Sequence, residues 1–162
     1  MSLYDRNREG VKEKAPYDEA YLKDVMSVHG LMFVKLTEEK SEYDIFSMID
    51  TYMRHSEIRA KMDIGNWSAL NKGYKQLLNS IDFSLCEPAE IIGSDMLPDP
   101  ILLKWAADIY VLLQWYYDIP SAEISKKLPS RELCATYNPL HETSYTNACT
   151  KLYKKYLSDI ND

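Results

Sequence analysis

Positive charge and glycine are both scarce in this 162-residue chain. Nineteen Lys and Arg side chains stand against 25 Asp and Glu side chains, which leaves a formal net charge of −6. A protein that wraps a nucleic-acid backbone needs the opposite sign, so the composition argues against a broad nucleic-acid groove. Only five glycines are present and none belongs to a glycine-rich phosphate loop, which argues against a nucleotide cradle.

Signals for metal binding and for thiol chemistry are missing as well. The histidines are isolated and the cysteines form no Cys-x-x-Cys pair: His29, His55 and His141, and Cys86, Cys134 and Cys149. Because no ligand spacing is present, we predict no bound metal and no cofactor. An odd number of widely spaced cysteines favours free thiols in a reducing cytoplasm. No catalytic motif occurs, so the sequence leaves enzymatic activity open but favours a binding role.

No apolar run is long enough to suggest a membrane helix. The most hydrophobic stretch spans residues 101–117 and contains Lys104, Asp108 and Gln114. A membrane-spanning helix requires about 20 predominantly apolar residues. We therefore interpret this stretch as a buried helix of a cytoplasmic protein that has no membrane partner.

Hydrophobic periodicity indicates helices along most of the chain. Apolar residues recur every three or four positions, and no segment alternates in the manner of a strand. The predicted helices lie at 17–40, 45–53, 56–62, 67–81, 100–118, 122–128, 131–137 and 144–158. The helix at 100–118 begins at an Asp99-Pro100 capping signal and is apolar on nearly all sides. The prediction is an all-α, irregular single-domain bundle of about seven or eight helices around this central helix.

The first 16 residues differ from the rest of the chain. Residues 1–16 have mixed charge and no apolar period, so they contain no stripe that a core could bury. They are expected to form a mobile N-terminal arm, followed by a single helical domain over 17–162. Between 82 and 99 we predict loops with at most one short helical turn, because prolines and a glycine interrupt the pattern there.

The densest group of polar side chains is the candidate ligand site. Its members, together with one carboxylate from the central helix, are Arg54, His55, Arg59, Lys61, Asp63, Asn66 and Asp108. Guanidinium groups and the free N–H groups at a helix start bind phosphates and carboxylates through charge-assisted hydrogen bonds. A structural alternative pairs Arg59 with Asp63 at four-residue spacing on a solvated helix. For Asp108 the alternatives are a charge that lines a pocket and an ion pair with Lys104.

Residues 121–138 resemble a helix-turn-helix module. Two short predicted helices follow one another there, and the second would present Arg131, Thr136 and Asn138 to bases. The segment departs from the pattern at Pro129, where such turns usually hold glycine. The resemblance implies a DNA-binding regulator, whereas the net charge argues against nucleic acid as a partner.

Tyrosine is abundant, at 13 of the 162 residues. Several tyrosines lie outside or beside the apolar stripes: Tyr4, Tyr17, Tyr43, Tyr116, Tyr117 and Tyr153. Tyrosine is enriched at protein interfaces because it combines a large contact area with a hydroxyl that tolerates water. The leading hypothesis is a protein–protein interaction or regulatory module that binds another protein, or itself as a homo-oligomer, through a surface lined by Tyr and Met with an acidic rim.

Two further hypotheses remain open at this stage. The negative net charge would also suit an acidic regulator of a basic protein. A small-molecule or anion-binding protein, or an enzyme, would use Arg54 and Arg59.

Overall fold

A computed structural model, which describes residues 2–90 and 97–160, confirms the all-α bundle. In this part of the chain the α-helices are α1 (Leu22–Glu39), α2 (Ile45–His55), α3 (Glu57–Asp63), α4 (Trp67–Leu70), α5 (Tyr74–Asn79), α6 (Pro100–Tyr117), α7 (Ser121–Lys127), α8 (Ser130–Ala135), α9 (Tyr137–Leu140) and α10 (Tyr145–Leu152). Short 3-10 helices, η1 and η2, lie at Glu19–Tyr21 and Phe83–Leu85, and a π-helical turn, η4, continues α10 over Tyr153–Leu157.

The described residues contain ten α-helices, more than the sequence predicts. One reason is that the segment predicted as a single helix over 67–81 is divided into α4 and α5. Gly73 has the extended backbone of an N-cap, with φ of −84° and ψ of 171°, and α5 begins after it. The other addition is α9, a single turn beyond α8. In the predicted loop region the structure contains η2, while residues 91–96 lie outside the described residues.

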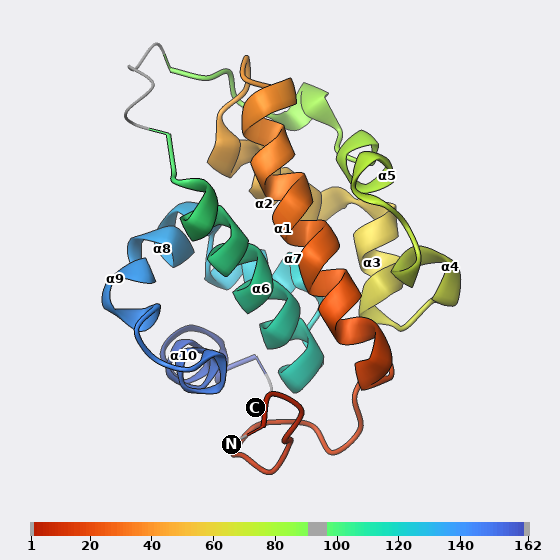
Figure 1. The fold of residues 1–162 in the computed structure, drawn as a ribbon, viewed down its shortest axis with the longest axis vertical. Helices are drawn as coiled ribbons and strands as arrows, with labels where there is room; N and C mark the ends of the chain where they lie inside the picture. Colours follow the sequence, from red (N-terminus) through yellow and green to blue (C-terminus); the bar gives the residue numbers. More distant parts are fainter. Residues whose placement is uncertain (1, 91–96, 161–162) are drawn as a thin grey trace.

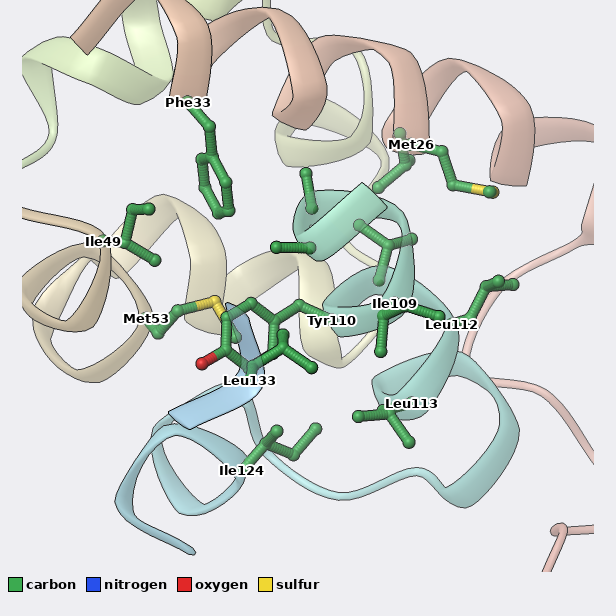
Figure 2. Close-up of a cluster of buried hydrophobic side chains, with 14 of the residues drawn as sticks. Met26, Phe33, Ile49, Met53, Ile109, Tyr110, Leu112, Leu113, Ile124 and Leu133 are labelled. Atoms are coloured by element: carbon green, nitrogen blue, oxygen red, sulfur yellow. The ribbon is translucent and has the colours of Figure 1, made fainter. Parts of the chain in front are cut away.

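The central position of α6 agrees with the prediction. Its N-cap Asp99 accepts a hydrogen bond from the N–H of Ile101, and thirteen of its residues are buried. Figure 1 shows α1 and α6 side by side, with α2, α3 and α7 behind them. In the close-up of Figure 2, side chains of α1, α2, α7 and α8 meet those of α6; they include Phe33, Ile49, Met53, Tyr110, Ile124 and Leu133. Most of α6 is enclosed in this way, and its polar residues Lys104 and Asp108 are exposed and half-buried, respectively.

Residues 2–16 lie against the C-terminal end of α6 and against α10. The Arg6 guanidinium lies 4.5 Å from the ring centroid of Trp115 and donates to the Tyr116 carbonyl oxygen at 3.1 Å. Arg8 lies 4.3 Å from the Tyr116 ring centroid and donates to the Thr146 carbonyl oxygen at 3.0 Å. The segment predicted as a mobile arm therefore has specific contacts with the domain. Some of these contacts are made by guanidinium groups, which apolar periodicity does not reveal, and Leu3, Tyr4, Val11 and Ala15 also pack against the core.

Gly65 forms the corner between α3 and α4 and has a left-handed backbone, with φ of +77°. A Cβ at this position would overlap the carbonyl oxygen of Pro16, a backbone atom that cannot move aside easily. We therefore expect Gly65→Ala to lower the free energy of unfolding by about 2–3 kcal/mol, because the left-handed strain and the backbone clash add together. Urea denaturation followed by circular dichroism measures this difference.

The matched control is Gly73→Ala, at a second glycine that begins a short helix. Gly73 has a negative φ, and the atom nearest to an added Cβ, Oε1 of Gln76, is 4.0 Å away. Alanine fits there, so the free energy of unfolding should change by less than about 1 kcal/mol. Equal losses in the two variants would contradict the role assigned to the Gly65 corner.

Candidate functional site

The structure does not bring the predicted ligand residues into one site. Arg59 and Asp63 are buried, Arg54 and His55 line a cleft, Lys61 and Asn66 are exposed, and Asp108 lies half-buried on α6. Asn66 has a structural role as the N-cap of α4, where its side-chain oxygen accepts the N–H of Ala69 at 3.0 Å. The expected single anion site spanning residues 54–66 is therefore not present as a unit.

Arg59 belongs to a buried network rather than to a surface site. Its side chain is 1% exposed, and Nη2 lies 3.5 Å from Oδ1 of Asp63. Nε donates to Oγ of Ser121 at 2.7 Å. Ser121 in turn donates its hydroxyl and its backbone N–H to the two carboxylate oxygens of Asp63, at 2.7 and 2.8 Å. Arg59 and Asp63 are therefore paired, as the structural alternative predicts, but the pair lies inside the protein and not on a solvated helix. There it links α3 to α7 and leaves no surface for a ligand.

His29 extends this network toward α1 and α2. Its Nδ1 lies 2.7 Å from the carbonyl oxygen of Val25, so this nitrogen must carry the proton. Nε2 then accepts hydrogen bonds from the Tyr52 hydroxyl at 2.7 Å and from Nη1 of Arg59 at 3.3 Å. Burial, with a smaller contribution from the Arg59 charge, lowers the pKa of His29 to about 3. His29 is therefore a neutral core histidine.

Asp108 has a partner other than the predicted one. The Tyr145 hydroxyl donates to its Oδ2 at 2.7 Å. Burial raises the pKa of the Asp108 carboxyl, and this hydrogen bond opposes the rise. The ion pairs found among the described residues do not include Lys104 with Asp108. The tyrosine comes from α10, a contact that spacing within one helix cannot reveal.

Arg54 and His55 are the predicted residues that line a cleft. The cleft lies beside α2, between η2 and α8, and has a volume of about 470 Å³. The Arg54 guanidinium is held in place by Ser125, to whose Oγ and carbonyl oxygen it donates at 3.0 Å each. A cleft of this volume is large enough for a small organic molecule.

A different feature, which the sequence does not single out, is the apolar corner formed by Ile64 and Trp67. These side chains are 79% and 69% exposed. Ile64 follows the last residue of α3, and Trp67 is the first residue of α4. The only available signal in the sequence is Gly65-Asn66 between them, which predicts the end of one helix directly before the start of another. Because the backbone of Gly65 packs on Pro16, the corner is held in a fixed shape.

The segment that forms this corner carries no charge. Residues 64–71 read Ile-Gly-Asn-Trp-Ser-Ala-Leu-Asn and contain no acidic or basic side chain. The polar side chains within this segment are therefore amides and a hydroxyl, and the nearest charged side chain along α3 that is exposed is Lys61.

The expected surface of tyrosine and methionine does not occur among the described residues. None of the 13 tyrosines is classed as exposed. Six are buried: Tyr17, Tyr52, Tyr110, Tyr116, Tyr117 and Tyr153. The described methionines are buried too: Met26, Met32, Met48, Met53 and Met62. The hydroxyl of a buried tyrosine can donate to a backbone oxygen, as that of Tyr110 does to the carbonyl oxygen of Leu128 at 2.7 Å. The abundance of tyrosine therefore did not indicate that tyrosines are exposed.

The segment that resembles a helix-turn-helix module is short and packed against α2. Its second helix, α8, has six residues. Arg131, which the resemblance would assign to bases, lies 3.7 Å from Oδ1 of Asp44 and 4.6 Å from the ring centroid of Phe46. A recognition helix must project into a groove. This arrangement supports DNA binding less well than the other hypotheses.

Comparison with protein-family models, with curated proteins and with solved structures finds no match. Across residues 2–90 and 97–160, no helix combines the length and the apolar character that a membrane crossing requires. The function therefore has to be inferred from the exposed groups of the chain itself.

Proposed function

We propose that this protein is a cytoplasmic interaction module that binds another protein through the Ile64–Trp67 corner. The observation that carries the proposal is a tryptophan that is 69% exposed on a fixed turn, three residues after an isoleucine that is 79% exposed. Two large apolar side chains in contact with water raise the free energy of the isolated protein, and a partner that buries them lowers it. Free thiols on three widely separated cysteines support the cytoplasmic location.

The chemistry of the corner defines the partner surface that it fits. Tryptophan is enriched among the residues that dominate binding energy, and such residues insert into dry pockets on the partner. Because residues 64–71 carry no charge, these residues themselves form no ion pairs with a partner. The partner is therefore expected to present an apolar cleft bordered by uncharged polar groups, and binding should depend little on salt concentration.

The test begins with a photo-crosslinking amino acid placed at position 67 in the cells that produce the protein. The matched control carries the same amino acid at position 101, where Ile101 is 68% exposed at the start of α6. We expect a partner protein to be crosslinked from position 67 but not from position 101.

The partner is then purified and its affinity measured for Trp67→Ser and for the control Ile101→Ser. Loss of a central tryptophan should weaken binding by about 30-fold or more, which corresponds to about 2 kcal/mol. Unchanged affinity in Trp67→Ser would overturn the proposal. A homodimer that Trp67→Ser dissociates would identify a second copy of the chain as the occupant and would overturn the proposal of a different partner.

A further inference from the structure

The cleft beside α2 contains two opposite charges on one helix face. Asp50 and Arg54 are four residues apart on α2, so their side chains lie about one turn apart on the same face. Both line the cleft. The ion pairs found among the described residues do not join them to each other. The cleft is therefore lined by a cation and an anion that form no direct ion pair with each other.

Ser125 holds these two side chains in place. Its Oγ accepts a hydrogen bond from Nε of Arg54 at 3.0 Å and donates to Oδ1 of Asp50 at 3.3 Å. Oδ1 of Asp50 also accepts the N–H of Ser130 at 2.9 Å. Within the described residues, the hydrogen bonds of Arg54 use Nε and Nη2, and those of Asp50 use Oδ1. Nη1 of Arg54 and Oδ2 of Asp50 take part in none of these hydrogen bonds.

The remaining walls of the cleft combine apolar side chains with the hydroxyl groups of Ser47 and Thr51, with His55 and with one ion pair. Phe46, Leu85 and Pro129 contribute apolar surface. At the far end of the α2 face, Asp44 and Arg131 lie 3.7 Å from each other, so their charges largely cancel. The ligand that matches this lining carries one negative group, one positive group close to it and an apolar remainder.

We propose that this cleft binds a free α-amino acid with an apolar side chain. The carboxylate of the amino acid accepts from Arg54, whose guanidinium provides a forked set of donors. The ammonium donates to Asp50, and the apolar side chain lies against Phe46 and Leu85. A volume of about 470 Å³ accommodates an amino acid of this size. The site is separate from the Ile64–Trp67 corner, so the two proposals stand or fall independently.

A bare anion fits this cleft less well than a zwitterion. An inorganic phosphate bound at Arg54 would lie one helix turn from the Asp50 carboxylate, which repels it. Exposed His55 stands beside Arg54 and adds a second hydrogen-bonding group, but it leaves the Asp50 charge without a counter-ion.

Isothermal titration calorimetry with L-leucine and L-phenylalanine tests the proposal on the full-length protein. L-Leucinamide lacks the carboxylate and 4-methylpentanoate lacks the ammonium, so each analogue removes one of the two charge contacts. We expect each analogue, and inorganic phosphate, to bind at least about tenfold more weakly than L-leucine, since each lost charged contact is worth roughly 1.5 kcal/mol or more.

Variants locate the binding in the cleft. Arg54→Gln and Asp50→Asn should each weaken L-leucine binding by about tenfold or more. Because both side chains also hold Ser125, a third variant is needed whose fold is not at risk. Leu85 is 51% exposed, so Leu85→Glu should leave the fold intact while placing a carboxylate against the apolar side chain of the ligand. The matched control, Lys61→Gln, removes an exposed charge outside the cleft and should leave the affinity unchanged.

Three results would overturn the proposal. The first is the absence of binding of either amino acid at about 10 mM, a concentration above the Kd of even a weak small-molecule site. The second is equal binding of L-leucine and of an analogue that lacks one charge. The third is unchanged L-leucine affinity in Leu85→Glu. Trp67→Ser should leave L-leucine affinity unchanged, which keeps this test distinct from that of the interaction surface.

Discussion

Arg59→Ala is expected to lower the free energy of unfolding by about 3–5 kcal/mol, because it leaves the buried carboxylate of Asp63 without its cation. Arg59 is 1% exposed and lies within 3.5 Å of Asp63, so water cannot easily replace the lost guanidinium. The substitution also removes a donor to Ser121 and one of the two donors to His29. Few single changes in this protein would leave as many interior polar groups unsatisfied.

The measurement is urea denaturation of the wild type, Arg59→Ala and Lys61→Ala. Lys61 lies two positions along the same helix and is exposed, so its removal should change the free energy of unfolding by no more than about 0.5 kcal/mol. In an Asp63→Asn background, Arg59→Ala should lower the free energy of unfolding by a smaller amount, because a buried neutral amide is destabilised less than a buried carboxylate by the loss of the guanidinium. A loss below about 1 kcal/mol for Arg59→Ala alone would show that the interior ion pair does not stabilise α3 against α7.

Acidification is expected to destabilise the protein through His29, by up to about 1.4 kcal/mol for each pH unit below about 6.5. Burial lowers the pKa of His29 to about 3 in the folded state, whereas an unfolded histidine titrates near its ordinary value of 6.5. Between pH 6.5 and pH 3, His29 is therefore protonated in the unfolded chain but stays neutral in the folded chain. The stability that depends on neutral His29 is complete above pH 6.5 and is lost as the pH falls toward 3.

The hydrogen bonds of His29 explain why protonation of its ring is unfavourable in the folded state. Nε2 of His29 already accepts from Tyr52 and from Arg59. A proton on it would remove the acceptor of the Arg59 guanidinium, which can only donate, and would place a second positive charge beside it. Asp50 and Asp63 have the opposite effect on the free energy of unfolding as the pH falls. Burial raises the pKa of each carboxyl, so the folded state binds these protons more readily than the unfolded state.

A variant separates these contributions. Chemical denaturation of the wild type and of His29→Gln should be compared between pH 7 and pH 4. Glutamine does not titrate, so the stability advantage of the wild type should shrink steadily as the pH falls below 6.5. An advantage that stays constant across this range would show that His29 does not control the acid response.

Much of the local structure could be predicted from neighbouring residues. Asp99 caps α6 and Ser56 caps α3, as their positions before apolar stripes indicate. The apolar character of 100–118 on nearly all sides correctly predicts the central helix. These features depend on side chains within one or two helical turns, which is the range that sequence spacing describes.

The candidate sites could not be predicted in the same way. Arg54 and Arg59 are both basic side chains on short helices, yet Arg59 is buried and Arg54 lines a cleft. The difference arises from α7, where Ser121 meets Arg59 and Ser125 meets Arg54. These partners are 62 and 71 positions away in the chain, so no local pattern contains them.

The sequence by itself determined an all-α chain with a central apolar helix, because capping and periodicity act between near neighbours. The tertiary structure alone decided which polar and apolar groups meet water. Composition predicts a surface lined by tyrosine and methionine, but many of these side chains are buried. Ile64 and Trp67, in contrast, are exposed at the turn made by Gly65. Exposure depends on which distant segments pack together, and that is settled by the sum of many weak contacts over the whole bundle.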